Sequence, residues 1–548
     1  MTIILRVSVI FISICTQPKL LLAQWSNYIQ IGGYRDNDAA AVIDNAGNKY
    51  IAGSFNTQLE IDTVLLGSNG YSDIFIAKIN TANRLEWIKQ IGSYDPLDGS
   101  YIEGVGDIKL DQINNCIIIA GNNYDQITVD SVQVPPGSSF IAKINFNGEL
   151  QWLKAATPQG INNDRNNSPH LTLDPSGVVY WSGGIMRNSS VVDGVQLQPG
   201  GFLVKTLADG TTIWVRQTFK GFFPSYLVYS TKGLTFCGYP QGGAIMIDTV
   251  PITSNGLKAI VGRIDTNGIY QWANTRTGVV SAFNESMALR LTVGPSGSVF
   301  VIGRFSGDLI GGNDTLHNPG PASDGFWMKF DTDGNYVSME QAGSGNACGY
   351  GILEQPDGSF YQTGYFSNTL TFDSCSVTAQ NGTDMFVSLH DSNGVCQGIR
   401  TFGRAEGMWL SENAAGTVLL TARIWNTVLL GSDTITSTGQ RDCIVVEMQP
   451  IVMGEPELSR SGNQGLQIFA NPTTGKCRVV LPEELDPGRL WQLTIRDLKG
   501  TVISSREIDP LQPTIPIDIS AHAVGVYFVT VTDGKMRLSG KIVVERPK

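Results

Sequence analysis

The sequence has few charged residues, few histidines and no long apolar run beyond its N-terminus. Charged residues make up 16% of the 548 residues, against about 25% in ordinary globular domains. The net charge is −11, whereas a nucleic-acid-binding surface is basic. A transmembrane helix needs about 20 consecutive apolar residues. We therefore expect no nucleic-acid partner and no transmembrane segment in the mature chain.

Motifs of common catalytic chemistry are also missing. The sequence contains no G-x-S-x-G nucleophile elbow and no phosphate-binding Walker loop. Its four histidines stand in unrelated contexts, which argues against a histidine-based triad and against a zinc site. We therefore predict no catalytic residue, no metal site and no cofactor. The histidines are His170, His317, His390 and His522.

Cysteine is scarce, and its spacing includes no C-x-x-C pair, which argues against metal ligation. Cys116, Cys237 and Cys443 lie within apolar stretches and are predicted to be small buried hydrophobic residues. Once the N-terminal Cys15 is set aside, seven cysteines remain, so at least one is unpaired or pairs with another molecule. Alternatively, two members of a group of cysteines around the sixth repeat form one disulfide. That group is Cys348, Cys375 and Cys396.

What the sequence does have is glycine, 62 residues of it, and an internal repeat. In the clearest copy, a turn and a short strand ending in Gly53 are followed by an alternating strand and then by a strand opened by Trp87. The strand-closing glycine returns at intervals of 55 to 68 residues. Such a period is typical of stacked supersecondary units. The positions are Gly53, Gly121, Gly183, Gly238, Gly303 and Gly364, with Ala422 in the seventh place.

Each repeat accommodates four short β-strands with period-two alternation and Asn-Gly or Asp-Gly turns. Four antiparallel strands repeated radially form a propeller blade. We therefore predict an all-β chain with a seven-bladed β-propeller over residues 24–448. The seventh repeat lacks its fourth strand, and residues 25–32 resemble that strand in the first repeat, residues 87–92. The N-terminal strand is therefore predicted to close the ring and to remove two exposed sheet edges.

The repeat also resembles a known family. Its pattern of Asp73, Phe75, Lys78 and Trp87, followed by Ile-Gly, resembles the SBBP-type β-propeller repeat of bacterial secreted proteins. The resemblance covers about residues 25–447. It implies a propeller fold and an extracellular location, and it brings no common ligand or catalytic residue.

Residues 1–23 are predicted to be a signal peptide. Arg6 precedes an apolar core at residues 7–14 that is too short to span a bilayer, and Ala23 offers a small residue for cleavage. Cys15 follows the bulky Ile14, where a lipidation motif has a small residue. Plain secretion is therefore favoured.

The composition changes after residue 448. Residues 449–465 contain Pro, Gly and Ser without periodicity and are predicted to be a linker. Residues 466–548 contain several short strands, which favours a small Ig-like β-sandwich. The motif residues of this tail are Asn471, Pro472, Gly475, Asp497, Gly500, Gly525, Tyr527 and Lys541.

In order and spacing, these motifs resemble the type A C-terminal sorting domain of the type IX secretion system. The resemblance implies that the partner of the tail is the type IX secretion machinery. It also implies export through the periplasm to the outer surface of a gram-negative bacterium, with removal of the tail.

A short pattern, Asp-Ser/Thr followed by an apolar residue, occurs five times in the insert between the second and third strands. One interpretation is a hairpin turn in which Asp caps the backbone two residues on. The alternative is a resemblance to the bacterial O-glycosylation sequon Asp-Ser/Thr-apolar. The candidate glycan acceptors are Thr63, Ser131, Thr249, Thr315 and Thr434.

Two turn motifs resemble the motifs of known functional sites. Residues 331–335 resemble the start of a calcium loop but lack its distal glutamate, so a hairpin turn is predicted. Residues 209–214 resemble the Asp-box of sialidases and the Gly-x-x-x-Trp of quinoproteins. The periodic tryptophans are instead predicted to pack one blade on the next.

The sequence therefore predicts a secreted, cell-surface-displayed β-propeller that acts as a binding or adhesion scaffold. Its extracellular ligand, a glycan or a protein, is expected at the inserts and the blade-to-blade connections, because loops carry function more often than the scaffold does. The alternative is a secreted hydrolase, glycosidase-like, or a quinoprotein-like enzyme with its site at the propeller channel.

Overall fold

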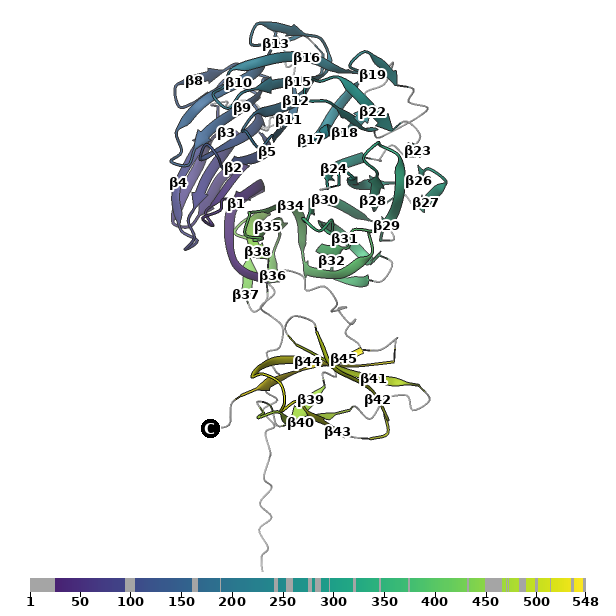
Figure 1. The fold of residues 1–548 in the computed structure, drawn as a ribbon. Coiled ribbons are helices and arrows are strands. Elements are labelled where there is room, and N and C mark those ends of the chain that lie inside the picture. Colours follow the sequence, from purple (N-terminus) through teal and green to yellow (C-terminus); the bar gives the residue numbers. More distant parts are fainter. Residues whose placement is uncertain are drawn as a thin grey trace, which may run out of the picture. The chain divides into compact units, whose positions relative to one another are not determined.

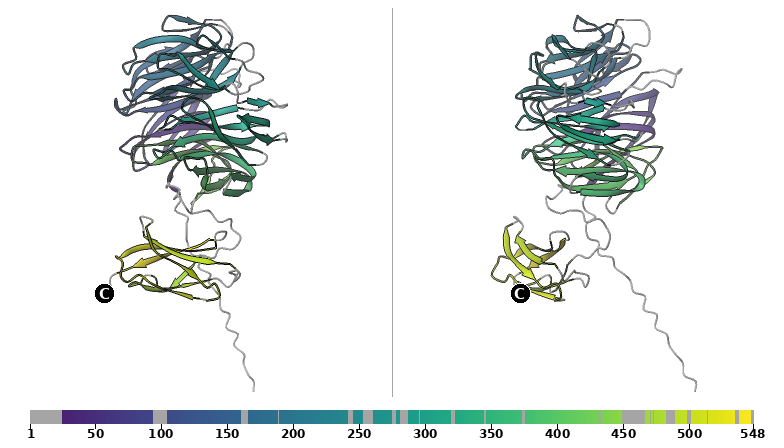
Figure 2. Two further views of the ribbon diagram at one scale, coloured as in Figure 1. Left: turned by 45° about the vertical axis from the view of Figure 1, so that its right-hand side comes forward. Right: turned by 90° about the vertical axis from the view of Figure 1, so that its right-hand side faces the viewer.

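The described part of the computed structural model consists of strands and connecting turns, with no helix among them (Figure 2). It comprises residues 25–93, 104–159, 166–187, 189–240, 245–252, 260–274, 278–280, 287–294, 296–318, 322–343, 346–372, 375–430, 433–448, 466–469, 471, 473–481, 489–497, 501–512, 514–533 and 537–545. The predicted signal peptide and linker lie outside these residues. The chain divides into two compact units, Met1–Glu457 and Leu458–Lys548, called the propeller domain and the tail domain below.

The propeller domain consists of four-stranded antiparallel sheets arranged around a common axis (Figure 1). In each sheet the chain starts at the axis and runs outward, so consecutive strands are hydrogen-bonded neighbours. This is the radial arrangement of a β-propeller. Each blade is named below after its innermost strand.

The strands of the first blades, from the axis outward, are β1 (Trp25–Ile43), β2 (Lys49–Ile61), β3 (Val64–Ile79) and β4 (Leu85–Ile91); β5 (Gly104–Asp111), β6 (Cys116–Asn122), β9 (Ser139–Asn145) and β10 (Leu150–Pro158); β11 (Asn166–Leu173), β12 (Val179–Ile185), β15 (Gly200–Thr206) and β16 (Thr212–Lys220). The later ones are β17 (Phe222–Ser230), β18 (Gly233–Pro240), β21 (Ile260–Ile264) and β22 (Tyr270–Asn274); β24 (Met287–Val293), β25 (Val299–Phe305), β28 (Asp324–Phe330) and β29 (Tyr336–Ala342); β30 (Ala347–Glu354), β31 (Phe360–Phe372), β32 (Cys375–His390) and β33 (Cys396–Gly403); and β34 (Ala405–Glu412), β35 (Val418–Ile424) and β38 (Asp442–Met448).

Strand β1 belongs to two blades. Its second half, residues 38–43, pairs with β2 as the innermost strand of its own blade. Its first half pairs with β38, from Trp25 opposite Met448 to Ile31 opposite Cys443, and so supplies the outermost strand of the β34 blade. The predicted closure of the ring by the N-terminal strand is confirmed by this pairing. Closure leaves neither strand with an open edge at this junction.

The insert between the second and third strands of a blade forms a hairpin. In the β1 and β30 blades the hairpin continues the long strands β2–β3 and β31–β32. In the β11 and β17 blades it pairs with the outermost strand of the preceding blade. Some of the hairpins therefore cover a neighbouring sheet edge. The separate hairpin strands are β7 (Ile127–Val129), β8 (Val132–Val134), β13 (Ser190–Val192), β14 (Val195–Leu197), β19 (Ile245–Ile247), β20 (Val250–Ile252), β26 (Gly307–Gly311), β27 (Asp314–Asn318), β36 (Thr427–Leu430) and β37 (Asp433–Thr436); β23 (Gly278–Val280) pairs with β26.

The tryptophans of the fourth strands bind the turn between third and fourth strands in the next blade. The indole N–H of Trp87 donates to the carbonyl of Phe146 at 3.0 Å, and Trp152 does the same to Ala208. Gly210, in the second of these turns, has φ +90, and a Cβ there would lie 2.7 Å from Trp152. A left-handed φ favours glycine, and the missing side chain lets the turn lie on the ring. The prediction that the tryptophans pack the blades is confirmed.

The Asp331 turn is a hairpin turn, as predicted. Its carboxylate Oδ1 accepts the backbone N–H groups of Asp333 and Asn335 at 2.9 and 2.8 Å. These bonds fix the turn locally. Among the described residues, no group of three or more His, Cys, Asp or Glu side chains is placed to hold a metal ion.

The cysteines divide into one disulfide and several buried thiols. Cys375 and Cys396 form a disulfide that joins β32 to β33, which decides between the alternatives left open by the sequence. Cys116, Cys237 and Cys443 are buried, as predicted for small hydrophobic residues. Cys348 and Cys477 are buried as well.

The tail domain has two antiparallel sheets around one apolar core. Trp491, Leu493 and Val529 lie at its centre and are at most 1% exposed. The described part of this domain contains no long helix, and no helix anywhere in the described chain is long and apolar enough to cross a membrane. One sheet holds β39 (Gln467–Phe469), β40 (Lys476–Val480) and β43 (Thr514–Asp518), and the other β42 (Val502–Ile508), β41 (Trp491–Asp497), β44 (Gly525–Thr532) and β45 (Arg537–Val544).

The turn–tryptophan contact can be tested with two glycines of equal backbone conformation. Gly394 has φ +93, and a Cβ there would lie 2.2 Å from the ring of Trp327, which makes the equivalent contact from the third strand of its blade, β28; Gly382 has φ +89 and open space around it. Both G394A and G382A force alanine into the left-handed region, at a cost of about 1–2 kcal/mol. We expect G394A to lose about 1–3 kcal/mol more, because the ring must move. Urea unfolding measures the difference, and equal losses would contradict the packing role.

Candidate functional site

The innermost strands present one equivalent residue each to the axis. This residue pairs with the one before the strand-closing glycine of the second strand. In β5, β11, β17, β24, β30 and β34 a β-bulge directly precedes it. Bulges re-aim side chains and are frequent next to functional sites. We call this set the axial ring; its members are Ala40, Asp107, His170, Tyr226, Arg290, Gly351 and Trp409.

Two aromatic rings meet across the axis. Tyr226 of β17 and Trp409 of β34 pack edge to face, with their centroids 6.2 Å apart. Their blades are not neighbours in the chain or in the ribbon (Figure 1). Tyr226 is 9% and Trp409 7% exposed. The edge of His170 packs on Tyr226 with a centroid distance of 5.6 Å. The chain's own side chains therefore fill the axis at this level.

Two cations lie against both aromatic rings. The Nζ atom of Lys109 is 4.7 Å from the centroid of Trp409 and 5.3 Å from that of Tyr226. The guanidinium carbon of Arg290 lies 4.7 and 4.8 Å from the same two centroids. Within about 6 Å such cations are attracted to the ring face. The four residues thus form one cation–π cluster that joins four blades.

The polar groups of the axial ring are largely paired among themselves. Lys109 donates to Asp107 at 2.7 Å and to the hydroxyl of Tyr226 at 3.2 Å. Burial opposes the charge of Lys109, but Asp107 and Tyr226 hold its pKa above the usual range. Burial, and then Arg290 and Lys109, lower the pKa of His170 well below its ordinary value. His170 is therefore neutral at physiological pH, and its buried Nδ1 has no hydrogen-bond partner.

A second group of polar residues lies where the innermost strands begin. Glu406 accepts from Arg423 at 3.0 Å. The rings of Tyr350 and Tyr365 lie 5.7 Å apart. Burial raises the pKa of Tyr365, and a side-chain hydrogen bond with Arg304 opposes that rise. We call these five residues the arginine–tyrosine cluster.

The arginine–tyrosine cluster is continuous with the axial ring. The Nε of Arg290 donates to the backbone carbonyl of Tyr350 at 3.2 Å. Tyr350 is the extra residue of the bulge in β30, between Gly349 and Gly351. Sequence reasoning missed both groups. The axial-ring residues could have been found in the sequence from their position, which is 12 to 14 residues before the strand-closing position of each repeat.

Two partly buried carboxyl groups lie at the other end of the innermost strands. Glu354 and Glu412 occupy equivalent positions, each paired with the first residue of the second strand. Burial raises the pKa of Glu354 to about 8, against the opposing charge of Lys329. Its Oε2 is buried without a hydrogen-bond partner. Burial also raises the pKa of Glu412, which accepts from Gln355 at 3.0 Å.

The five Asp-Ser/Thr motifs all lie in the insert hairpins. Asp62 and Asp130 have φ 53 and lie in the turn, as one interpretation predicted. Their carboxylates, however, accept the N–H groups of Leu85 and Leu150, which begin the fourth strands, and do not cap the backbone two residues on. The five candidate acceptors share an exposed side chain; they are Thr63, Ser131, Thr249, Thr315 and Thr434.

Several sorting-motif residues of the tail domain fasten its two ends together. The side chain of Asn471 donates to the carbonyl of Lys541 and accepts the N–H of Val543 at 2.7 Å. The carbonyl of Gly475, a residue with φ +119, accepts the N–H of Ile519 at 2.8 Å. The Asn471 contacts join the start of the domain to its last strand, β45, and the Gly475 contact joins it to the residue after β43.

Other motif residues act locally. The hydroxyl of Tyr527 donates to the carbonyl of Ala523 at 2.6 Å, beside Gly525 at the start of β44. Asp497 accepts the N–H of Thr501 at 2.9 Å. The side chain of Lys541 is exposed. Pro472 and Gly500 lie outside the described residues.

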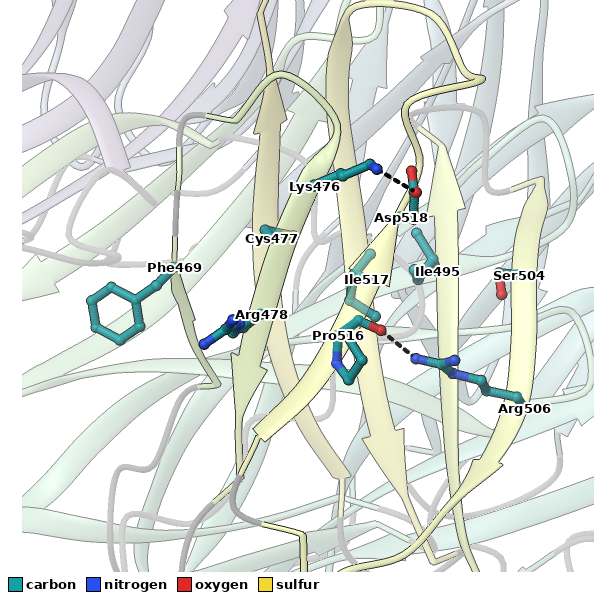
Figure 3. A pocket seen from close by; sticks show the side chains of 10 residues that line it. All are labelled: Phe469, Lys476, Cys477, Arg478, Ile495, Ser504, Arg506, Pro516, Ile517 and Asp518. Atoms are coloured by element: carbon teal, nitrogen blue, oxygen red, sulfur yellow. Dashed lines mark hydrogen bonds and ion pairs between the residues drawn. The ribbon is translucent and has the colours of Figure 1, made fainter.

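A cleft of about 810 Å³ opens between the two sheets of the tail domain (Figure 3). Its lining comes from β39, β40 and β43 of one sheet and from β41 and β42 of the other. Lys476 and Asp518 form an ion pair at 3.5 Å within one sheet, and Arg506 of the other sheet donates to the carbonyl of Pro516. The side chains that line the cleft are thus partly tied to one another.

Comparison with known proteins identifies the tail. Residues 467–545 match the secretion system C-terminal sorting domain, so the predicted sorting domain is confirmed. This domain indicates secretion, surface attachment and interaction with the secretion machinery in Bacteroidetes-type bacteria. No curated protein matches the chain.

Solved structures resemble the propeller domain only distantly. The Dos1 propeller is 10% identical, with a TM-score of 0.39 over 78% of this chain and 96% of its own. A DUF4221-family member from Bacteroides vulgatus is 8% identical (TM-score 0.32; 78% and 97% covered), and a mutant apocarotenoid oxygenase from Synechocystis is 11% identical (0.35; 77% and 96%). Similarities at these scores do not establish the fold of the chain. The propeller fold follows from the strand pairing described above.

The partly buried Glu354 predicts a pH dependence of stability. Its folded pKa of about 8 lies above the ordinary value of 4.5. Its contribution to stability is therefore complete below pH 4.5 and is lost as the pH rises toward 8, because the unfolded chain releases the proton first. E354Q removes this titration. We expect the melting temperature of E354Q to rise relative to the unsubstituted protein between pH 5 and pH 8.

Calorimetric melting at several pH values measures the effect of E354Q. E60Q, which neutralises an exposed glutamate on β2, controls for the loss of one negative charge. A difference between E354Q and the unsubstituted protein that stays constant over this pH range would rule out the raised pKa.

Proposed function

We propose that the protein is a secreted, surface-displayed seven-bladed β-propeller that acts as a binding or adhesion scaffold. Its sorting domain supports secretion and display. The observation that carries the scaffold role is the axial ring. There the single carboxylate, Asp107, is ion-paired with Lys109, the imidazole of His170 is neutral, and aromatic rings fill the centre. Glycoside hydrolysis commonly needs two carboxyl groups flanking a bound sugar.

The proposed domain boundaries follow the change in composition. A signal peptide covers residues 1–23, the propeller 24–448, a linker 449–465 and an Ig-like sorting domain 466–548. The SBBP-type pattern of the repeat and the two-sheet arrangement of the tail support these assignments. The extracellular ligand is a glycan or a protein.

A hydrolase is the second candidate, and Glu354 is the observation that favours it. A carboxyl group with a pKa of about 8 is protonated at neutral pH and can act as a general acid. Glu412, at the equivalent position of the next blade, also has a raised pKa. The quinoprotein-like alternative has less support, because Gly210 of that motif packs on Trp152.

A glycan array combined with a hydrolase screen distinguishes the two candidates. The scaffold role predicts that mature protein retains a glycan or protein ligand and releases no product from it. We expect both E354Q and the matched variant E412Q to retain ligand binding. Turnover that falls about a hundredfold or more in E354Q would establish the hydrolase instead.

The insert hairpins are proposed sites of O-glycosylation. The turn explains the aspartates, since their carboxylates hold the fourth strands, but it does not require a hydroxyl. In the β11 blade the equivalent turn is Asp193-Gly194, and Asp193 still contacts the fourth strand through Thr212. The exposed Ser and Thr hydroxyls are thus left available to a modifying enzyme.

Intact mass measurement of protein from its native host tests processing and modification together. We expect a C-terminus within residues 449–465, because the sorting domain is removed, and a mass above that of the polypeptide. The excess should disappear when the five hydroxyl residues are changed to alanine. A mass equal to that of the unmodified polypeptide would leave only the turn role, and a retained tail would contradict removal.

A further inference from the structure

The tail domain is the basic part of an acidic chain. Residues 466–548 contain 11 Lys or Arg and 9 Asp or Glu, whereas residues 1–465 contain 27 and 40. Cations gather at the cleft between the two sheets of the tail domain, where three of the four charged lining residues are basic (Figure 3). The cleft therefore has an excess of two positive charges. Its charged residues are Lys476, Arg478, Arg506 and Asp518.

The two arginines of the cleft are not neutralised. Lys476 and Asp518 form an ion pair, which matches one cation with the carboxylate. Arg506 donates to the backbone carbonyl of Pro516, which has no net charge. Arg478 forms no hydrogen bond or ion pair with any residue that the structure describes. Both arginine side chains are exposed, so an anionic ligand can reach them.

The arginines approach the same residue from different sheets. Arg478 of β40 lies directly opposite Pro516 in the strand register, and Arg506 of β42 is bonded to the carbonyl of Pro516. The planar fork of a guanidinium group matches the oxygens of a phosphate or a carboxylate. A phosphate has enough oxygens to bind two such forks at once, which favours it as the ligand.

The backbone at the cleft is poorly suited to bind a peptide strand. Among the described strands, β43 is the last of its sheet, so one of its edges has no neighbouring strand. Pro516 lies at the centre of β43 and has no N–H group to donate. Proline on an edge strand opposes the addition of a further strand. The ligand of the cleft is therefore recognised by side chains.

An exposed aromatic ring extends the row of arginines. Phe469 of β39 pairs with Arg478 in the register, and its side chain is 61% exposed (Figure 3). The face of a phenyl ring is electron-rich and attracts the C–H groups of a sugar. The cleft volume of about 810 Å³ is within the range of small-ligand sites, roughly 300–1,000 Å³.

We propose that the cleft of the tail domain binds a phosphorylated saccharide. Arg478 and Arg506 bind the phosphate, Lys476 adds a further positive charge, and the sugar ring lies on Phe469. The site is independent of the propeller and its ligand, and it exists only while the chain retains its tail. A soluble sugar phosphate and the phosphorylated headgroup of a glycolipid share this chemistry.

Calorimetric titration of the chain with its tail, using glucose 1-phosphate, tests the site. We expect binding that weakens as salt is raised, since exposed charges are screened. R478Q should weaken binding by roughly tenfold to a hundredfold, the effect of losing one charged hydrogen-bonding group. D518N should tighten binding, because it removes the carboxylate that competes for Lys476.

F469A separates the sugar from the phosphate. It should weaken the binding of glucose 1-phosphate and leave the weaker binding of inorganic phosphate unchanged. Vesicles with and without diphosphorylated lipid A then distinguish the two sources of the ligand. Binding of these vesicles without binding of glucose 1-phosphate assigns the site to a lipid headgroup, provided that R478Q abolishes it.

R496Q is the matched control. Arg496 is an exposed arginine of the same domain, but it does not line the cleft, and the neighbouring Ile495 is buried on the opposite face of β41. Its loss should leave the dissociation constant unchanged. Thermal unfolding shows whether R478Q is folded. R478K, which keeps the charge but not the fork, provides a second substitution if it is not.

Four results would overturn the proposal. Equal affinity for glucose would contradict anion recognition, and equal affinity for glucuronate would contradict the preference for phosphate. Weakening by R496Q as large as that by R478Q would show a general effect of charge and no defined site. Absence of binding to both glucose 1-phosphate and the lipid A vesicles would refute the site, while the scaffold function of the propeller would be unaffected.

Discussion

In the blades from β5 to β30, the propeller depends on a glycine turn that lies against an aromatic ring of the blade before it. A side chain in the turn would strike the ring, and a residue without a left-handed φ preference would strain the turn. Because the contact recurs with the repeat, it sets the spacing between blades independently of what any loop contains. The strand-closing glycines allow close packing at the other end of the same sheets. The scaffold can therefore tolerate variation at the axis and in the inserts.

Most of the fold could be predicted from the sequence because it is repetitive. Alternation, turn residues and the recurrent Gly53 and Trp87 positions locate the strands, and the surplus strand at the N-terminus indicates closure. The axial ring escaped prediction for the opposite reason. Its members share a register position but no residue type, from Ala40 to Trp409, so they look like unrelated positions until the strands are aligned.

The tail shows a different limit of sequence reasoning. Motif resemblance identified a sorting domain, but it could not say what each motif residue does. Asn471, Gly475 and Tyr527 mainly bind the backbone of their own domain. These motif residues are thus needed largely for the folding of the tail domain. Secretion machinery that recognises the motif therefore recognises a folded domain. Likewise, Asp62 and Asp130 of the insert turns each hold a strand some twenty residues away, which a local turn rule could not anticipate.

The strand that belongs to two blades links folding to the order of synthesis. Residues 25–31 leave the ribosome before the rest of the propeller, yet their partner β38 is completed more than 400 residues later. Closing so long a loop is costly in entropy and slow relative to local pairing. Before closure, the array is an open ring with two unpaired strand edges. The β38 strand of one molecule can then pair with the first strand of another molecule. Correct closure is therefore a competition between one chain's own ends and a neighbour's, decided by concentration in the compartment where the ring completes.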